Sequence, residues 1–296
     1  MGIAINRAPS CEPEHLLRNA DAAMLRAKQI GGCCYQIFDE TMRQKTLALL
    51  ELENELKTAI QNKEFLVYYQ PIVELQTGNI SGLEALLRWK HSVKGFISPA
   101  NFIPVAEETG IILDLGIWIF KETCKQLKSW NFPITISVNL SVRQLEQPDL
   151  LDKIDEILTQ TEIDTNFLKI ELTESVFTEN YESIKKILEQ FQARKIRVSL
   201  DDFGTGYSCL SYLHQLPINT LKIDRAFVNR ESLEIAETII VLAHNLDMDV
   251  VAEGVETEQQ RAQLQSLGCE YGQGYLFAKP MSDRDIGKLL GIAKNI

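Results

Sequence analysis

Two adjacent acids end an apolar stretch in the middle of this 296-residue chain. The segment Arg197–Gly206 runs through Val and Leu into Asp201 and Asp202, and two glycines follow closely. Carboxylates at the end of a buried strand are ligands that a hard metal ion prefers. Acids are also common in turns, so the assignment depends on whether other strands end in matching groups.

Matching groups stand at the ends of other apolar stretches: Glu84, Asn139, Glu171 with Glu174, Lys222 with Asp224, Glu253 and Gln273. A single Glu in such a place is more often a helix cap or a salt-bridge partner, and Lys222 alone is also consistent with an ion pair at the bottom of a barrel. Polar groups on so many strand ends together indicate one site. Two like charges ~4 Å apart repel by about 4 kcal/mol at an effective dielectric of roughly 20, so cations must compensate.

The candidate ligands are oxygen atoms, and none of the 4 histidines lies near another in the sequence. Oxygen ligands without His or Cys select hard ions, so we expect Mg²⁺ or Mn²⁺ rather than zinc. Two ions about 3.5–4 Å apart, bridged by Asp201, would activate water and offset charge on a phosphodiester. Lys222 supplies a positive charge for the phosphate or the nucleophile, and Asp224 shares its face.

Asp201 and Asp202 are neighbours in a predicted strand, where successive side chains face opposite sides. Both can serve one site only if the chain leaves strand geometry at this point. Gly204 and Gly206 make such a bend plausible, because glycine adopts backbone conformations that other residues avoid. We therefore predict a bent backbone at Asp202.

Short apolar strands alternate with helical patterns along most of the chain, which is typical of a parallel sheet covered by helices. The strands are predicted at Phe65–Leu75, Ile80–Trp89, Thr135–Leu140, Leu168–Leu172, Val198–Asp201, Thr220–Ile223, Val250–Ala252 and Tyr271–Phe277. The helices include Ile112–Trp130, Tyr181–Arg194, Leu233–Leu246 and Thr257–Leu267, and a further helix opens at Ser98–Pro99 as its cap and first turn. About eight strands favour a closed (β/α)8 barrel of the TIM type over an open sheet. The first two form a hairpin, so one strand is antiparallel.

The N-terminal part reads as a small α/β fragment: a strand at Gly2–Ile5, a helix at Pro13–Ile30 and a strand at Cys34–Phe38. One helix and two short strands bury little surface, so this piece is expected to be the end of a larger domain. Residues 40–62 form a charged helix with a stripe of leucines. We interpret it as a connecting helix that packs on the domain after it.

Composition excludes several classes of protein. The net charge of −11 argues against a surface that coats nucleic acid. No apolar run approaches the ~18 residues of a membrane span, and the start resembles no signal peptide. The 6 cysteines lack a CxxC spacing, so we expect reduced thiols in a cytoplasmic protein without zinc or disulfides.

Residues 45–292 resemble the EAL domain, a family of cyclic di-GMP phosphodiesterases. The motifs that carry the resemblance are Tyr69-Gln-Pro-Ile72, Glu84-Ala-Leu-Leu-Arg-Trp89, Val138-Asn-Leu-Ser141, Glu171-Leu-Thr-Glu174, Asp201-Asp-Phe-Gly-Thr-Gly206, Leu221-Lys-Ile-Asp224, Ala252-Glu-Gly-Val-Glu256 and Gly272-Gln-Gly274. One departure is Cys209, where the family usually has serine. No ligand of the family's motifs is missing.

The resemblance implies a role for each matching residue. Metal ligands would be Glu84, Asn139, Glu171 and Asp201 for one ion, with Asp201 and Asp202 for the second. Catalytic groups would be Glu84, Lys222, which holds the attacking water, and Glu253, which acts as or near the general base. Contacts to the dinucleotide would come from Gln70, Arg88 and Gln273. Supporting residues would be Glu174, which holds the loop 202–206 near a dimer interface, Asp224 and Glu256.

Residues 1–39 resemble the C-terminal end of a GGDEF (diguanylate cyclase) domain, through Arg18-Asn-Ala-Asp-Ala-Ala-Met24 and Tyr35-Gln-Ile-Phe-Asp39. Leu25 stands where that family usually has Tyr, and the Gly-Gly-Asp-Glu-Phe signature is absent from the chain. The fragment therefore carries no cyclase activity. Its presence implies upstream GGDEF or sensor domains in a longer parent protein.

The sequence thus predicts a metal-dependent phosphodiesterase, homodimeric in the manner of the family, that converts cyclic di-GMP to linear pGpG. Two alternatives stay open. The first is a catalytically silent cyclic di-GMP receptor, which usually lacks a metal ligand. The second is an unrelated metal-dependent hydrolase built on a barrel.

Overall fold

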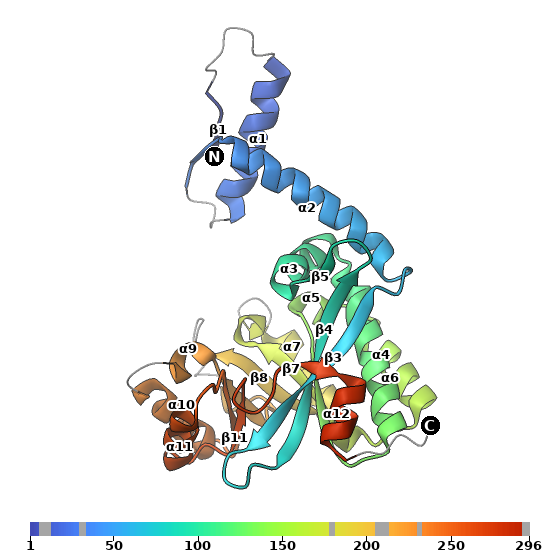
Figure 1. The fold of residues 1–296 in the computed structure, drawn as a ribbon, viewed down its shortest axis with the longest axis vertical. Helices are drawn as coiled ribbons and strands as arrows, with labels where there is room; N and C mark the ends of the chain where they lie inside the picture. Colours follow the sequence, from blue (N-terminus) through green and yellow to red (C-terminus); the bar gives the residue numbers. More distant parts are fainter. Residues whose placement is uncertain (6–12, 30–33, 178–180, 205–212, 230–232, 292–296) are drawn as a thin grey trace.

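Eight strands close into a barrel in the computed structural model, which describes residues 1–5, 13–29, 34–177, 181–204, 213–229 and 233–291. In order around the barrel they are β3 (Phe65–Glu74), β4 (Ile80–His91), β6 (Thr135–Asn139), β7 (Leu168–Thr173), β8 (Arg197–Phe203), β9 (Thr220–Ile223), β10 (Asp249–Glu253) and β11 (Tyr271–Gln273). The strand β11 pairs with β3 and so closes the ring. The predicted barrel is confirmed (Figure 1).

One barrel strand runs against the others. β3 pairs antiparallel with β4 and with β11, whereas the six pairings from β4 through β11 on the other side are parallel. The hairpin turn between β3 and β4 contains Gly78 at φ 76°, a left-handed conformation that suits glycine. Two short strands, β5 (Gly95–Ile97) and β12 (Met281–Ser282), extend the sheet beyond β4 and β3.

Helices cover the outside of the barrel (Figure 1). The larger ones are α3 (Pro99–Thr109), α4 (Ile112–Trp130), α6 (Leu150–Thr161), α7 (Tyr181–Ala193), α10 (Glu234–Asn245), α11 (Glu258–Ser266) and α12 (Asp283–Leu289), with the short α5 (Val142–Leu145) and α9 (Arg225–Val228) after β6 and β9. α11 begins at the predicted position, with a capping box formed by Thr257 and Gln260. Ser98 occupies the N-cap of α3, but its side chain makes no capping hydrogen bond, so only Pro99 fulfils that part of the prediction.

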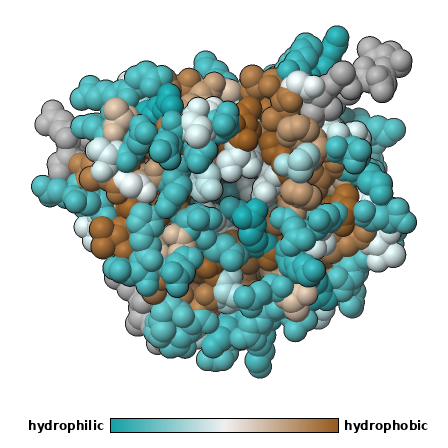
Figure 2. Space-filling model, turned by 90° about the horizontal axis from the view of Figure 1, so that it is seen from below, coloured by the Kyte–Doolittle hydropathy of each residue, from teal (hydrophilic) through white to brown (hydrophobic). Residues whose placement is uncertain are grey.

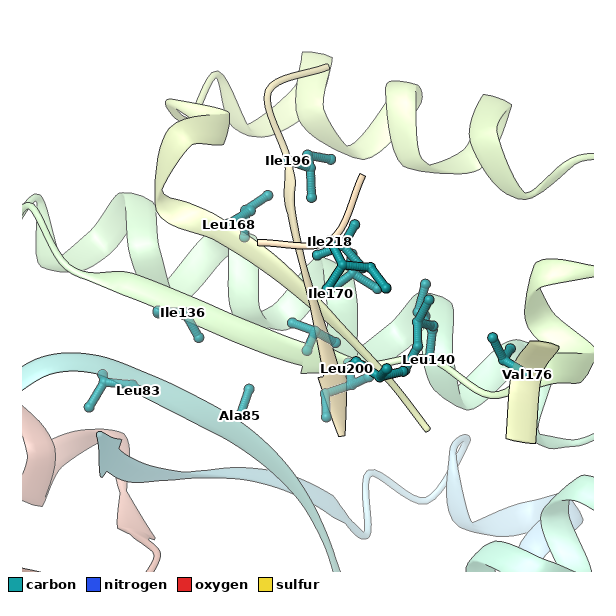
Figure 3. Close-up of a cluster of buried hydrophobic side chains, with 14 of the residues drawn as sticks. Leu83, Ala85, Ile136, Leu140, Leu168, Ile170, Val176, Ile196, Leu200 and Ile218 are labelled. Atoms are coloured by element: carbon teal, nitrogen blue, oxygen red, sulfur yellow. The ribbon is translucent and has the colours of Figure 1, made fainter. Parts of the chain in front are cut away.

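The strands alternate between apolar and polar side chains, and this alternation positions the site. Leu83 and Ala85 flank Glu84 and are buried, as are Ile170 and Leu172 on either side of Glu171. Figure 3 shows such side chains gathered from several strands. Because neighbours in a strand face opposite sides, the polar residues between them face the barrel interior.

The N-terminal fragment lies apart from the barrel at the far end of α2 (Glu40–Ala59) (Figure 1). Its strands β1 (Gly2–Ile3) and β2 (Gln36–Ile37) pair in parallel, and α1 (Pro13–Gln29) packs against both. The leucine stripe of α2 divides: Leu56 is buried in the barrel's core cluster, whereas Leu49 is 39% exposed. The predicted packing of this helix therefore holds only for its C-terminal part.

Three of the predicted thiols can be placed. Cys124 and Cys269 are buried, Cys34 is half-buried, and all three are free; Cys11, Cys33 and Cys209 lie outside the described residues. Among the helices that the structure describes, none has the length and apolar character needed to cross a membrane. Figure 2 shows polar and apolar residues interspersed on one face of the molecule.

Candidate active site

The predicted site residues meet at the C-terminal ends of the barrel strands. Strand register accounts for this meeting, because residues opposite each other on adjacent strands project to the same face. Asn139 on β6 pairs with Glu171 on β7, and Glu253 on β10 pairs with Gln273 on β11. Residues far apart in the sequence thus line one end of the barrel.

Lys222 is the centre of the site. Its side chain is 1% exposed, and its Nζ lies near four carboxylates. The distances are 2.6 Å to Glu253, 2.8 Å to Glu171, 3.2 Å to Asp201 and 3.7 Å to Glu84. A buried ammonium group with this surrounding offsets part of the repulsion between the acids.

Glu84 is held by two amide side chains. Asn139 Nδ2 donates to its Oε1 at 2.7 Å, and Gln273 Nε2 donates to its Oε2 at 2.6 Å. Gln273 Nε2 also reaches Gln70 Oε1 at 3.2 Å, and Gln70 in turn donates to the carbonyl of Ala278. The two carboxylate oxygens of Glu84 are therefore oriented before any ligand binds.

The backbone bends at Asp202, as predicted. Its φ is 53°, in the left-handed region, and the register between β8 and β9 shifts between Leu200 and Phe203. As a result, carboxylate oxygens of Asp201, Asp202 and Glu253 lie within 4.8 Å of one another. The prediction that Asp202 joins Asp201 on one side is confirmed.

Gly204 continues this bend with φ 91°. Its backbone N–H donates to Glu174 Oε2 at 3.2 Å, and Glu174 is buried just after the end of β7. The contact ties the end of β8 to its neighbour. Gly206 and the rest of the loop lie outside the described residues.

The pKa values of the carboxyls diverge. Burial, opposed by Lys222, raises the pKa of Glu171 to about 8 and that of Glu253 to about 7. Burial and the nearby Asp201 raise the pKa of Asp202 to about 6. For Glu84 burial is outweighed by Lys222 and the two amides, so its pKa is lowered. The pKa of Lys222 is raised well above its usual value, because the four carboxylates outweigh its burial.

The donor set fits divalent cations. Two groups of carboxylates have ligand atoms within 4.8 Å of one another: Glu84, Glu171 and Asp201, and Asp201, Asp202 and Glu253. Asp201 belongs to both groups. Among the described residues, Glu171 Oε1 is buried and has no hydrogen-bond partner, so it is available to a cation. Ligands that are all oxygen suit Mg²⁺ or Mn²⁺.

Three predicted residues lie at the edge of this arrangement. Asp224 caps α9 by accepting from the N–H of Ala226, and its proximity contributes to the raised pKa of Asp202. Arg88 lies within β4, beyond the part that pairs with β6, and its Nη1 donates to the carbonyl of Leu87. Glu256 is exposed after β10, and it belongs to neither carboxylate group.

Two aromatic side chains next to Arg88 were not predicted. The guanidinium carbon of Arg88 lies 5.9 Å from the ring centroid of Tyr68, and the Tyr68 ring is 5.9 Å from that of Phe96. Tyr68 pairs with Leu86, so Arg88 is its diagonal neighbour across the hairpin. The alternation of side chains along β3 and β4 would have placed Tyr68 beside Arg88. Phe96 could not be placed in this way, because it belongs to β5, which was not predicted.

Gln144 is a third residue that sequence reasoning missed. Its Oε1 accepts from the N–H of Ser141 at 3.0 Å and forms the capping box of α5, which follows Asn139 closely. The side chain is buried against Gly116 of α4, where a Cβ would lie 1.5 Å from Gln144 Nε2. The pattern Ser-x-x-Gln at 141–144 is the signal that identifies this cap.

Curated relatives extend along nearly the whole chain. The bifunctional diguanylate cyclase/cyclic di-GMP phosphodiesterase MucR of Pseudomonas aeruginosa is 38% identical over 290 residues, which cover 95% of this chain and 42% of that protein. The cyclic di-GMP phosphodiesterase PdeR of Escherichia coli is 35% identical over 289 residues, 95% of this chain and 44% of that protein. The chain thus spans less than half of the length of these relatives.

Solved structures share the fold. The PaMucR phosphodiesterase in complex with c-di-GMP has a TM-score of 0.77 at 38% identity and covers 80% of this chain and 99% of that one. The EAL enzyme Bd1971, with cAMP and cyclic di-GMP bound, has a TM-score of 0.80 at 34% identity and covers 95% of this chain and 77% of that one. The model of the EAL domain family matches residues 53–280, and the chain therefore belongs to the EAL domain family.

Proposed function

We propose that this protein is a phosphodiesterase that hydrolyses one phosphodiester bond of cyclic di-GMP and releases linear pGpG. The observation that carries the proposal is the pair of carboxylate groups that share Asp201 around Lys222. Relatives named as cyclic di-GMP phosphodiesterases and an EAL enzyme with bound cyclic di-GMP support the choice of substrate.

Two divalent ions, Mg²⁺ or Mn²⁺, are proposed as cofactors. Glu84, Asn139, Glu171 and Asp201 would hold one, and Asp201 and Asp202 would hold the other, with Glu253 close to it. Such ions generate a nucleophile from water at neutral pH and offset the negative charge of the phosphodiester. Glu84 is already oriented by hydrogen bonds from Asn139 and Gln273.

Glu253 is proposed as the general base. In the metal-free protein burial raises its pKa to about 7, and nearby cations would lower this value, so Glu253 is available as an unprotonated carboxylate at neutral pH. Lys222, 2.6 Å from Glu253, is proposed to hold the attacking water by donating a hydrogen bond to its oxygen. The water proton would pass to Glu253, and the departing ribose oxygen would then be protonated by solvent.

Substrate contacts are proposed for Gln70, Arg88 and Gln273. Gln70 and Gln273 are buried beside Glu84, where their amides can hydrogen-bond to polar edges of the dinucleotide. Arg88 offers a planar guanidinium for a phosphate or a guanine edge. Its position over the Tyr68 ring limits the orientations of that plane.

Incubation of the protein with cyclic di-GMP and Mg²⁺ or Mn²⁺ tests the proposal. We expect linear pGpG that depends on the added metal, and we expect Glu84→Ala to abolish it while the protein stays folded. Intact protein that forms no metal-dependent linear product would contradict the proposal.

A cyclic di-GMP receptor without turnover is the alternative function. One observation favours it. Lys222 offsets the negative charge of the carboxylates without a metal ion, so the end of the barrel that would bind cyclic di-GMP can form in the metal-free protein. Tight binding of cyclic di-GMP in Mn²⁺ without any product would identify a receptor. Indifference to cyclic di-GMP would instead identify an unrelated metal-dependent hydrolase.

Residues 1–39 are proposed to be the C-terminal part of a GGDEF domain, joined by the helix 40–62 to an EAL barrel at 45–292. A two-stranded parallel sheet with one helix leaves apolar residues uncovered, among them Leu17 at 68% and Ile37 at 45% exposure. Parallel sheets are normally covered on both faces, so further strands and helices would complete this one. The chain covers 42% of the relative MucR, so that relative contains residues beyond the aligned part.

A homodimer is proposed as the assembly, with the loop held by Glu174 near its interface. Turnover measured against protein concentration, together with the molar mass from light scattering, tests this assembly. We expect a dimer mass at concentrations where turnover per subunit is highest. A monomer with full turnover would contradict the dimer and leave the proposed activity unaffected.

A further inference from the structure

The opposite end of the barrel contains a second set of charged side chains. A cavity of about 40 Å³ lies there, at the N-terminal ends of the strands. Its lining includes the charged residues Lys169, Arg197 and Asp249 and the hydroxyl-bearing residues Ser81, Thr135, Ser137 and Tyr271. None of these residues takes part in the proposed hydrolysis, so the cavity is separate from the candidate active site.

Lys169 and Arg197 come from adjacent strands and are paired in register, so they project side by side into the barrel. Each makes one side-chain hydrogen bond to a hydroxyl group. Lys169 Nζ donates to Thr220 Oγ1 at 2.9 Å, and Arg197 Nη2 donates to Thr135 Oγ1 at 2.8 Å. Within the described parts of the chain, neither cation has a carboxylate oxygen within 4.0 Å.

The charges around the cavity do not balance. Asp249 is the one carboxylate among the described lining residues, against the two cations Lys169 and Arg197. Burial and the nearby Arg197 lower the pKa of Lys169 to about 8, and Glu171 and Asp249 only partly oppose them. An ammonium group has three donors and a guanidinium has five, so most of the N–H groups of Lys169 and Arg197 are not used by the two hydroxyls. Two neighbouring cations repel each other, and an anion between them would remove that repulsion.

We propose that this cavity is a binding site for a small monatomic anion, such as a halide, held by Lys169 and Arg197. A water-sized occupant needs at least about 10–15 Å³, so a cavity of about 40 Å³ has room for one such ion and a companion water. The anion would link β7 to β8 at the end of the barrel opposite the carboxylates. Its role is structural, and it does not depend on the proposed hydrolysis.

Thermal unfolding tests the proposal in solution. The melting temperature is measured while potassium gluconate is replaced by potassium bromide at constant ionic strength. We expect a saturable rise in the melting temperature for the unmodified protein and its loss in Arg197→Gln and Lys169→Gln. Lys186→Gln, which changes an exposed lysine on α7, should retain the rise.

A bromide-soaked crystal of the unmodified protein supplies a second measurement that does not depend on variants folding. We expect an anomalous scattering peak between Lys169 Nζ and the Arg197 guanidinium. The absence of a peak there, together with identical melting in bromide and gluconate, would overturn the proposal. Loss of activity would say nothing about this site, and loss of the halide effect would say nothing about the hydrolysis.

Discussion

Lys222 Nζ lies 2.6 Å from a carboxylate oxygen of Glu253, at the point where two groups of carboxylates meet. The same ammonium group contacts Asp201, which both groups share. A single buried cation therefore joins the proposed general base to the proposed bridging ligand. Four acids surround this one lysine, so the metal-free site holds more negative than positive charge.

Replacement of Lys222 by methionine should destabilise the metal-free protein by about 3–5 kcal/mol, because removal of one partner leaves buried charges uncompensated. Urea unfolding in the presence of a chelator measures this free energy. Saturating Mn²⁺ should restore part of the loss, since the metal supplies positive charge to the same carboxylates. Lys186→Met is the control on an exposed lysine, and it should change stability by no more than about 0.5 kcal/mol. Equal stability of Lys222→Met and the unmodified protein without metal would contradict the role of the ammonium group.

The stability of the metal-free protein should fall as the pH rises from about 5 to about 8. The folded pKa values of Glu171, Glu253 and Asp202, about 8, about 7 and about 6, lie above the ordinary values of 4.5 for Glu and 3.8 for Asp. A group with a raised folded pKa stabilises the fold fully below its unfolded pKa, and this contribution is lost as the pH rises through the folded pKa. Unfolding free energies across this range check the sign, and a rise in stability over the same window would refute it.

Metal binding should reverse this pH dependence. The ligands must lose their protons before they bind a cation, so metal affinity increases with pH. The rise in melting temperature caused by Mn²⁺ should be larger at about pH 8 than at about pH 6, where more of Glu171 and Glu253 is protonated. An equal rise at both pH values would show that the metal displaces no protons from these two carboxyls.

Gly204→Ala should lower turnover by about 10²-fold, the effect expected of a small displacement of catalytic groups. Gly204 has φ 91°, a conformation that is strained for alanine, and a Cβ would lie 3.1 Å from the Phe227 ring, so the end of β8 or that ring must shift. Gly95→Ala is a matched control, because Gly95 has φ 73° and open space around it, on a hairpin away from Asp202. Both variants should lose stability, but only the first should lose turnover. Equal turnover of the two variants would rule out a positioning effect at Gly204.

Gly116→Ala should act through Gln144. The new Cβ overlaps the amide of Gln144, which must leave its place and break the capping box at Ser141. Loss of a cap costs about 0.5–2 kcal/mol, measurable by urea unfolding. In a Gln144→Ala background the same substitution should cost much less, because the overlapping amide is gone. Independent, additive effects of the two substitutions would show that Gly116 does not act through Gln144.

The sequence predicted the closed barrel and the convergence of the site because both arise from local patterns. Apolar strands that each end in a polar group must bring those groups together when the strands are parallel and adjacent. The bend at Asp202 was predictable for a similar reason, since two neighbouring acids serve one site only if the strand geometry ends there. Its φ of 53° confirms this.

Other features depend on contacts between distant segments, which no local pattern contains. The strand predicted at Tyr271–Phe277 ends at Gln273. After it, Gly274 packs so closely on Val255 that a Cβ would lie 2.1 Å from the Val255 carbonyl oxygen, and the N–H of Leu276 donates to that same oxygen. The placement of Lys222 among four carboxylates requires the register of several strands at once. The short strand β5, with Phe96 beside Tyr68, was not predicted, because it contains no apolar run.

The proposal that two ions share Asp201 can be tested by the rate at which cyclic di-GMP is converted to pGpG. This rate is measured as Mn²⁺ is added, in the unmodified protein and in the variant Asp201→Asn. Binding of cyclic di-GMP is followed in the same samples. If both ions bind Asp201, the unmodified protein should form product only when metal is added. The variant should lose turnover but still bind the dinucleotide. Full turnover in Asp201→Asn, or binding without product in the unmodified protein at any Mn²⁺ concentration, would contradict the proposed two-metal hydrolysis.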